Sequence, residues 1–194
     1  MKAINNWSEV KEAGGEIVSL PAGGYICEIK RCEEKPNKSG NGTHLEIFFD
    51  VARGDYRGWF REDYDAQQRE DKYWHGIIRQ NVPDESSPKY GAQCGFFKRF
   101  TNAVEASNSG YHWDWNEAGL KGKLIGIVFG DVEKESKRGT RYMTTQPSEI
   151  VTVEAIEKDT YKVPAPKMLA PQYPSQNVNV PQELNDLDTG DLPF

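Results

Sequence analysis

The chain has 194 residues, of which 37% are hydrophobic, and it carries 24 Lys and Arg against 30 Asp and Glu, a net charge of −6. No apolar run approaches the ~18–20 residues of a membrane-spanning helix, the first residues lack the apolar core of a secretion signal, and three cysteines are too few for a disulfide scaffold. We therefore expect a cytoplasmic protein with one folded domain, in which any site for a polyanion is a local basic patch.

Three predicted strands occupy the first half of the chain. Residues 25–34 are rich in β-forming side chains and follow a Gly-Gly pair. Residues 43–52 carry an apolar side chain at every second position, which indicates a strand with one face in the core. A tight turn then leads to the third predicted strand, residues 56–64. Together these segments predict an antiparallel meander.

The second half of the chain alternates between helical and strand-like patterns. Residues 93–106 show helical periodicity and predict a helix with one face in the core. That face carries three phenylalanines: Phe96, Phe97 and Phe100. Residues 121–132 and 141–156 are predicted as the fourth and fifth strands, joined by a charged loop.

This element order predicts a mainly β protein with a helical insertion. Three strands, a helical stretch and two further strands are the order of the OB-fold, a small five-stranded Greek-key barrel. The same order fits other small α+β sheets, and periodicity alone does not separate the two.

The composition changes near Asp159, where five prolines begin to alternate with Gln, Asn, Ser and Ala. Such a stretch cannot bury enough apolar surface to offset the entropy of ordering it. We expect residues 1–158 to form the folded domain, residues 159–182 a Pro-rich flexible linker, and residues 183–194 a disordered acidic tail.

The predicted third strand carries an aromatic side chain between two cations. Arg57, Trp59 and Arg61 would share one face, because side chains alternate along a strand. Proteins that bind single strands without sequence preference use rings that stack on bases and cations that contact the phosphates. Phe48, on the outer face of the second strand, would extend this platform. The alternative is that Trp59 covers the barrel while the two arginines bond to nearby acids.

A second candidate surface is basic and surrounds the fourth and fifth strands. The loop between them carries Lys137 and Arg138, and OB-folds use this loop to hold oligonucleotides. The loop with Lys35 and Lys38, between the first two strands, is used in the same way. The remaining candidates are Lys123, Arg141 and the possible base-stacking ring of Tyr142. Charged hairpin loops are usually only solvated, so this hypothesis depends on the role of Trp59.

The end of the chain is the most specific feature of the sequence. It closes with Asp-Leu-Pro-Phe, so the last residue presents an aromatic ring and a terminal carboxylate on one Cα. The proline limits the backbone freedom lost on docking, and the acids add long-range attraction. The predicted partner-binding residues are Asp188, Asp191, Leu192, Pro193 and Phe194. The alternative is a solubility tail that ends by chance in Phe.

This ending resembles the terminus of bacterial single-stranded-DNA-binding proteins, in which several Asp precede Ile-Pro-Phe. The body resembles the single-stranded-DNA-binding proteins that phages encode beside recombination and replication genes. The similar stretches are residues 20–25, 35–45 and 119–123, and the resemblance covers most of residues 17–158. It implies an OB-fold body that holds single-stranded DNA and a tip that recruits replication, recombination or repair enzymes.

These observations favour a non-catalytic single-stranded-DNA-binding protein of phage or prophage replication or recombination, acting in the bacterial host, with self-association left open. There is no phosphate-binding loop, no nucleophile elbow and no metal-ligand spacing of His and Cys, so we expect no catalytic residue, metal or cofactor. Cys27 and Cys32, five apart in a strand, would face opposite sides. Two alternatives remain: a replication-protein adaptor that does not bind DNA, and a Mg-dependent nuclease built on acidic pairs such as Asp63 and Asp65.

Overall fold

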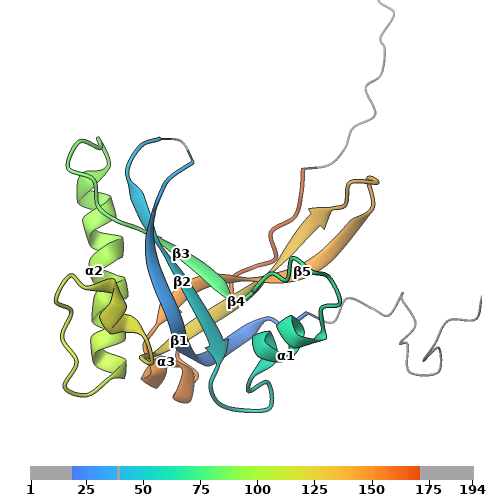
Figure 1. Ribbon diagram of the computed structural model, residues 1–194, viewed down its shortest axis with the longest axis horizontal. Helices are drawn as coiled ribbons and strands as arrows, with labels where there is room; N and C mark the ends of the chain where they lie inside the picture. The colour runs from blue at the N-terminus through green and yellow to red at the C-terminus, as the bar shows by residue number, and fades with distance from the viewer. Residues whose placement is uncertain (1–18, 39, 171–194) are drawn as a thin grey trace, which may run out of the picture.

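The computed structural model describes residues 19–38 and 40–170, which form a mainly β fold, as expected (Figure 1). A five-stranded antiparallel sheet has the strand order β3-β2-β1-β4-β5. The strands are β1 (Gly23–Pro36), β2 (Thr43–Val51), β3 (Ile77–Asn81), β4 (Leu124–Glu135) and β5 (Arg141–Val151). The helices are α1 (Trp59–Ala66), α2 (Tyr90–Ser107), the short 3-10 helix η2 (Glu117–Leu120) and α3 (Val153–Glu157).

The core lies on one face of the sheet, under α2. Alternate residues of β2 are buried there, which confirms the predicted pattern: Leu45, Ile47, Phe49 and Val51. The expected helix is also present, and Phe97 and Phe100 enter the core from it. Phe96 does not, because the helix turns its side chain to solvent, where 64% of it is exposed. The prediction that all three phenylalanines belong to the core is therefore wrong for Phe96.

The prediction of a third strand over residues 56–64 is wrong. Residues 56–64 form the end of a turn and most of α1, which starts where the Asp50 carboxylate accepts hydrogen bonds from the N–H groups of Val51 (2.9 Å) and Phe60 (3.0 Å). The Phe60 ring is buried against Phe49, with ring centroids 5.3 Å apart, and is stacked on Phe129 at 6.2 Å. Burying this ring favours a helix packed on the core over a strand continuing the meander, a contribution of about 1.5–3 kcal/mol.

The real third strand, β3, comes from a segment that local pattern leaves ambiguous. It enters beside β2 at Gly76, whose carbonyl accepts a hydrogen bond from the Phe49 N–H (2.8 Å). A Cβ at Gly76 would lie 2.3 Å from the Phe49 carbonyl oxygen, so only glycine permits this approach. The Trp74 indole N–H also donates to the Phe49 carbonyl (3.0 Å), which holds the segment before β3 against β2.

A bulge in β1 changes which of its residues face the core. The register with β2 shifts between Ile29 and Arg31, which leaves Lys30 as an extra residue. As a result Cys27 and Cys32 are both buried, whereas strict alternation predicted opposite faces. Burial raises the pKa of the Cys32 thiol to about 12.

The sheet is not closed into a barrel. In the described part of the chain, β3 and β5 are its two edge strands and do not pair with each other. This strand order, with α2 between β3 and β4, is compatible with the OB-fold, which is a partly open barrel.

The chain after α3 packs along β4, so the first part of the predicted linker has main-chain partners. Lys167 donates its N–H to the Asp131 carbonyl (2.9 Å) and accepts from the Glu133 N–H (2.8 Å). The Pro164 ring covers Gly130, where a Cβ would meet it at 2.4 Å. The remainder of the predicted linker and the predicted tip, residues 171–194, lie outside the described residues. Across residues 19–38 and 40–170, none of the helices could cross a membrane.

Candidate nucleic-acid interface

A groove of about 500 Å³ lies on the outer face of the sheet, over β1, β2 and β3. Its lining combines four aromatic and four cationic side chains with one acid, and we call it the strand-face groove. The aromatic side chains are Phe48, Tyr64, Tyr73 and Trp74; the cations are Lys30, Arg31, Lys35 and Lys72; and the acid is Glu46. Ile77 also lines it.

Phe48 forms the floor of the groove. In the two ladders it lies opposite Arg31 of β1 and Ile77 of β3, and its ring is half-buried. The Arg31 guanidinium lies 4.0 Å from the ring centroid, and the Lys35 ammonium lies 5.5 Å from it. The β1 bulge makes this contact, because it brings Arg31 rather than Lys30 opposite the ring. An aromatic ring with cations over its face combines the two kinds of group that contact a base and its phosphate.

The segment after α1 forms the wall of the groove. The Trp74 indole N–H donates to the Gly76 carbonyl (3.1 Å) in addition to the Phe49 carbonyl, and these hydrogen bonds fix the ring. The centroid of the Trp74 ring lies 5.8 Å from that of the Tyr64 ring. The Lys72 ammonium lies 5.5 Å from the Tyr64 ring centroid. Tyr73, which lies between Lys72 and Trp74 in the sequence, keeps 49% of its surface exposed. The wall therefore has one fixed ring and one ring open to a ligand.

A buried carboxylate organises the cations. Glu46 is buried and accepts hydrogen bonds from Lys35 and from Arg79 (2.8 Å). Burial raises the pKa of Glu46, but these hydrogen bonds outweigh it and hold the pKa below its ordinary value. The hydrogen bonds to Glu46, and then to Glu33, raise the pKa of Lys35. Glu46 thus holds Lys35 in the groove and Arg79 beside it on β3.

Two other cations of the groove are paired with acids at the surface. Lys30 lies 3.1 Å from Glu28, and Arg31 lies 3.3 Å from Glu33, with all four side chains more than a third exposed. Such exposed pairs contribute only ~0.2–1 kcal/mol, so a phosphate can replace the acid without a large penalty.

A second hollow, of about 480 Å³, continues from the groove between α1 and β5, and we call it the α1–β5 cleft. It shares Tyr73 and Ile77 with the strand-face groove. Its lining includes Trp59, Asp63, His75, Arg79, Lys134 and Thr144. The His75 Nδ1 lies 2.6 Å from an Asp63 carboxylate oxygen, which ties the segment before β3 to α1.

The predicted face of Arg57, Trp59 and Arg61 does not exist, because the segment is not a strand. Residues two apart on a helix point about 200° apart, so Trp59 and Arg61 diverge on α1. Trp59 is half-buried against Tyr56 (5.6 Å between ring centroids) and lines the cleft, while Arg61 pairs with Asp65 at 3.0 Å. Arg57 lies exposed in the turn before the helix. This arrangement is closer to the alternative in which Trp59 covers the core.

The predicted basic surface is divided between two ends of β4. Lys137 and Arg138 are exposed in the β4–β5 turn, whereas Lys123 precedes β4 with its ammonium 4.5 Å from the Tyr111 ring centroid. The twelve residues of β4 span ~40 Å at ~3.4 Å per residue, so these cations do not act together. Arg141 is engaged by Glu133 (3.6 Å) and by the Ala170 carbonyl (2.8 Å).

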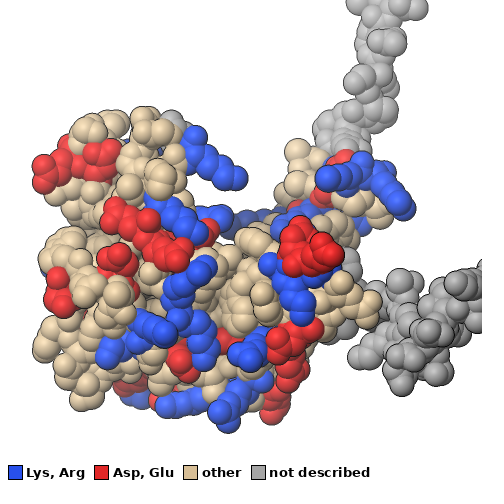
Figure 2. All heavy atoms as spheres, viewed as in Figure 1, with Lys and Arg blue, Asp and Glu red and all other residues tan. Residues whose placement is uncertain are grey.

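Tyr142 is 37% exposed and lies opposite Lys134 in the β4–β5 ladder. Because Thr144 is two residues further along β5, Tyr142 shares its face and extends the wall of the cleft toward the hairpin. Figure 2 shows Lys and Arg side chains around the hollow between the β1–β2 and β4–β5 hairpins, with acidic side chains beside them. Of the predicted residues, Phe48, Trp59 and Tyr142 therefore border one continuous surface.

Sequence reasoning missed most of the groove wall. Lys72, Tyr73 and Trp74 belong to a stretch that lacks strand periodicity before Ile77. The available signal was the pair of adjacent aromatic residues that directly follows Lys72. The outward position of Arg31 had no sequence signal, since the bulge depends on pairing with β2.

Comparisons with known proteins leave the site to be judged on its own chemistry. No protein-family model matches the chain, and a search of curated proteins gives no match either. Within residues 19–38 and 40–170, no three His, Cys, Asp or Glu side chains are grouped to hold a metal ion. The groove's distinctive property is its combination of rings and cations.

Proposed function

We propose that the protein binds single-stranded DNA without catalysis, through the strand-face groove of an OB-like body of the type that phages encode. The observation that carries the proposal is the Phe48 ring, half-buried on the floor of a groove and contacted by the Arg31 guanidinium at 4.0 Å. Each stacked base contributes ~1–3 kcal/mol, and every base has a face to stack, so such a groove tolerates any sequence.

The local charge supports a polyanion ligand even though the whole chain is acidic. Four cations and one acid line the groove, while the net charge of the chain is −6. Phosphates would compete with Glu28 and Glu33 for Lys30 and Arg31, and the Lys72 ammonium lies free of acidic partners within the described residues. Affinity should therefore fall as salt rises, through release of counterions.

The C-terminal tip supplies the second part of the proposal. We infer from the sequence that Asp-Leu-Pro-Phe recruits replication, recombination or repair enzymes to the bound strand. A peptide of residues 183–194 should bind such an enzyme with a Kd near the micromolar range, and the same peptide without Phe194 should not. Equal binding of the two peptides would reject the tip as the recruiting element.

Fluorescence anisotropy of a labelled oligo-dT tests the groove. The full chain should bind at low salt, and Phe48→Ala should weaken binding roughly 5- to 150-fold, the equivalent of one stacked base. Tyr90→Ala is the matched control, because this ring is 38% exposed at the start of α2 and lines none of the hollows described above. Equal affinities for the two variants would remove Phe48 from the site. If the unaltered chain does not bind at any salt concentration, the proposal fails in favour of the adaptor.

A further inference from the structure

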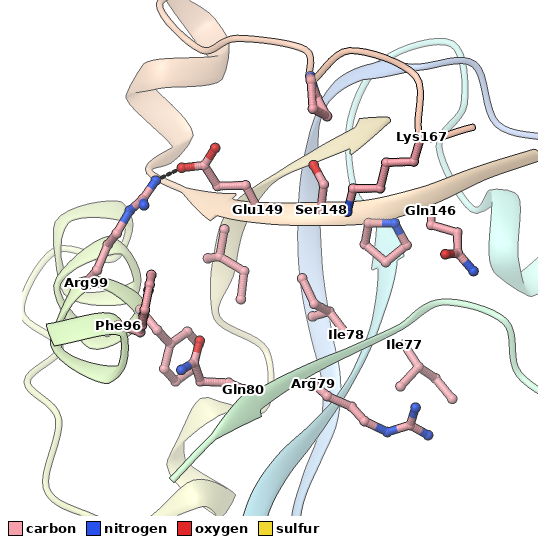
Figure 3. Close-up of a pocket in the computed structure, with 14 residues that line it drawn as sticks. Ile77, Ile78, Arg79, Gln80, Phe96, Arg99, Gln146, Ser148, Glu149 and Lys167 are labelled. Atoms are coloured by element: carbon pink, nitrogen blue, oxygen red, sulfur yellow. Dashed lines mark ion pairs between the residues drawn. The ribbon is translucent and has the colours of Figure 1, made fainter. Parts of the chain in front are cut away.

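The open edge of the sheet forms a third hollow. A cavity of about 640 Å³ lies between β3 and β5, with α2 on a third side and the segment after α3 on a fourth (Figure 3). We call it the seam, because β3 and β5 would have to pair there to close the sheet. Its polar and aromatic lining includes Arg79, Phe96, Arg99, Gln146, Ser148 and Lys167.

The seam continues the surface already assigned to DNA. Ile77 lines the strand-face groove, the α1–β5 cleft and the seam. Arg79, Gln146 and Pro147 line both the cleft and the seam. A strand that lies on Phe48 and passes Tyr73 therefore has an uninterrupted path past the edge of β3 into the seam.

The seam offers both a ring and cations. Phe96 is 64% exposed on a helix whose neighbouring phenylalanines are buried, so its ring is free to stack. The main-chain hydrogen bonds of Lys167 to β4 fix its backbone, and this residue forms no ion pair within the described part of the chain. Figure 3 shows Phe96 and Arg99 entering from α2 and Lys167 from another side of the cavity.

The Arg99–Glu149 ion pair joins α2 to β5 across the seam (Figure 3). Both side chains are more than a third exposed, at 57% and 37%. An entering phosphate can therefore displace Glu149 from Arg99 at low cost.

An added peptide strand is the competing occupant, since both walls are sheet edges. The β5 edge is poorly suited to pairing with a peptide strand, because Pro147 has no N–H to donate. In addition, the β4–β5 register shifts between Val128 and Phe129, and Phe129 lies opposite Pro147. The charged lining is also biased, with three cations, Arg79, Arg99 and Lys167, against the single acid Glu149. Both observations favour a nucleic acid strand.

We infer that the seam holds a second segment of the same single strand, with a base on Phe96 and a phosphate at Lys167. This inference rests on the proposed function. A strand that occupies both sites must be longer than one that fills the strand-face groove alone. OB-fold sites range from ~4 to ~16 nucleotides, so oligomers near these two limits separate the sites.

Anisotropy titrations with (dT) oligomers of roughly 5 and roughly 16 nucleotides test the inference. Phe96→Ala should weaken binding of the longer oligomer roughly 5- to 150-fold and leave the shorter one unchanged. Lys167→Ala should lower the salt slope of the longer oligomer by ~0.7, the value for one lost phosphate contact on a single strand. Tyr90→Ala and Lys121→Ala, both exposed outside the seam, are the matched controls.

The outcomes separate the inference from the proposal on which it rests. If Phe48→Ala weakens both oligomers while Phe96→Ala and Lys167→Ala weaken neither, the groove stands and the seam is rejected. If the seam variants weaken both oligomers equally, the seam is not a second segment, and the inference is again overturned. No binding of either oligomer by the unaltered chain rejects the proposed function itself. Thermal melting of each variant checks that the exposed substitutions leave the fold intact.

Discussion

The strand-face groove and the β4–β5 turn are both basic, but they differ in what surrounds their cations. In the groove, Arg31 lies against the Phe48 ring and Lys35 is held by Glu46. In the turn, Lys137 and Arg138 are exposed at the tip of a hairpin. The groove gains its organisation from pairing between three strands, whereas the turn depends only on local chain reversal. Charge alone thus does not distinguish an organised groove from a solvated loop.

The largest expected effect comes from disrupting the β2–β3 pairing, which the groove requires and the β4–β5 turn does not. Gly76→Ala places a Cβ 2.3 Å from the Phe49 carbonyl oxygen, a backbone atom that no rotamer change can move. We expect a loss of about 3 kcal/mol in the free energy of unfolding, measured by urea denaturation. Gly91→Ala, with no atom within 4 Å of the new Cβ, is the control and should be neutral or slightly stabilising. Equal stability of the two variants would show that β3 does not depend on this close approach.

The next effect concerns the carboxylate that organises the groove's cations. Glu46→Gln should lower the free energy of unfolding at pH 7 by ~1–3 kcal/mol, because it weakens the hydrogen bonds from Lys35 and Arg79. The pKa of Glu46 is lowered in the folded state, so its contribution is present above the ordinary Glu pKa of ~4.3 and is lost as the pH falls through the folded-state value. The difference between the two proteins should therefore shrink in acid.

Glu33→Gln is the control for this measurement. Glu33 pairs with the same Lys35 at 3.2 Å but is exposed, and its replacement should change the free energy of unfolding by less than ~1 kcal/mol. A stability difference for Glu46→Gln that stays constant from neutral to acidic pH would contradict the role assigned to its charge.

The smallest expected effect compares one cation from each region. Lys72→Ala should reduce the slope of log affinity against log salt by ~0.7, because Lys72 lines the groove beside Tyr64. Lys137→Ala should leave the slope nearly unchanged, since this side chain lies in the exposed turn. The two variants remove the same charge, so the comparison isolates position. A larger change for Lys137 than for Lys72 would move the binding surface to the hairpin.

Local periodicity correctly predicted β2 and α2, whose spacing of apolar residues does not depend on which segments pack against them. The alternation of β2 placed Phe48 on the outer face, and helical spacing located α2. Both predictions succeeded because a single face of each element meets the core. The segment 56–64 misled the same reasoning, because Phe60 packs among Phe49 and Phe129, which are distant in sequence.

The sequence by itself determined the mainly β class, the outward position of Phe48 and the acidic Asp-Leu-Pro-Phe ending, all of which follow from composition or short-range pattern. Only the tertiary structure decided that α1 replaces a strand, that a β1 bulge brings Arg31 onto Phe48, and that β3 and β5 leave the seam between them. Register and edge exposure arise from contacts between segments far apart in the chain, and no local pattern encodes them.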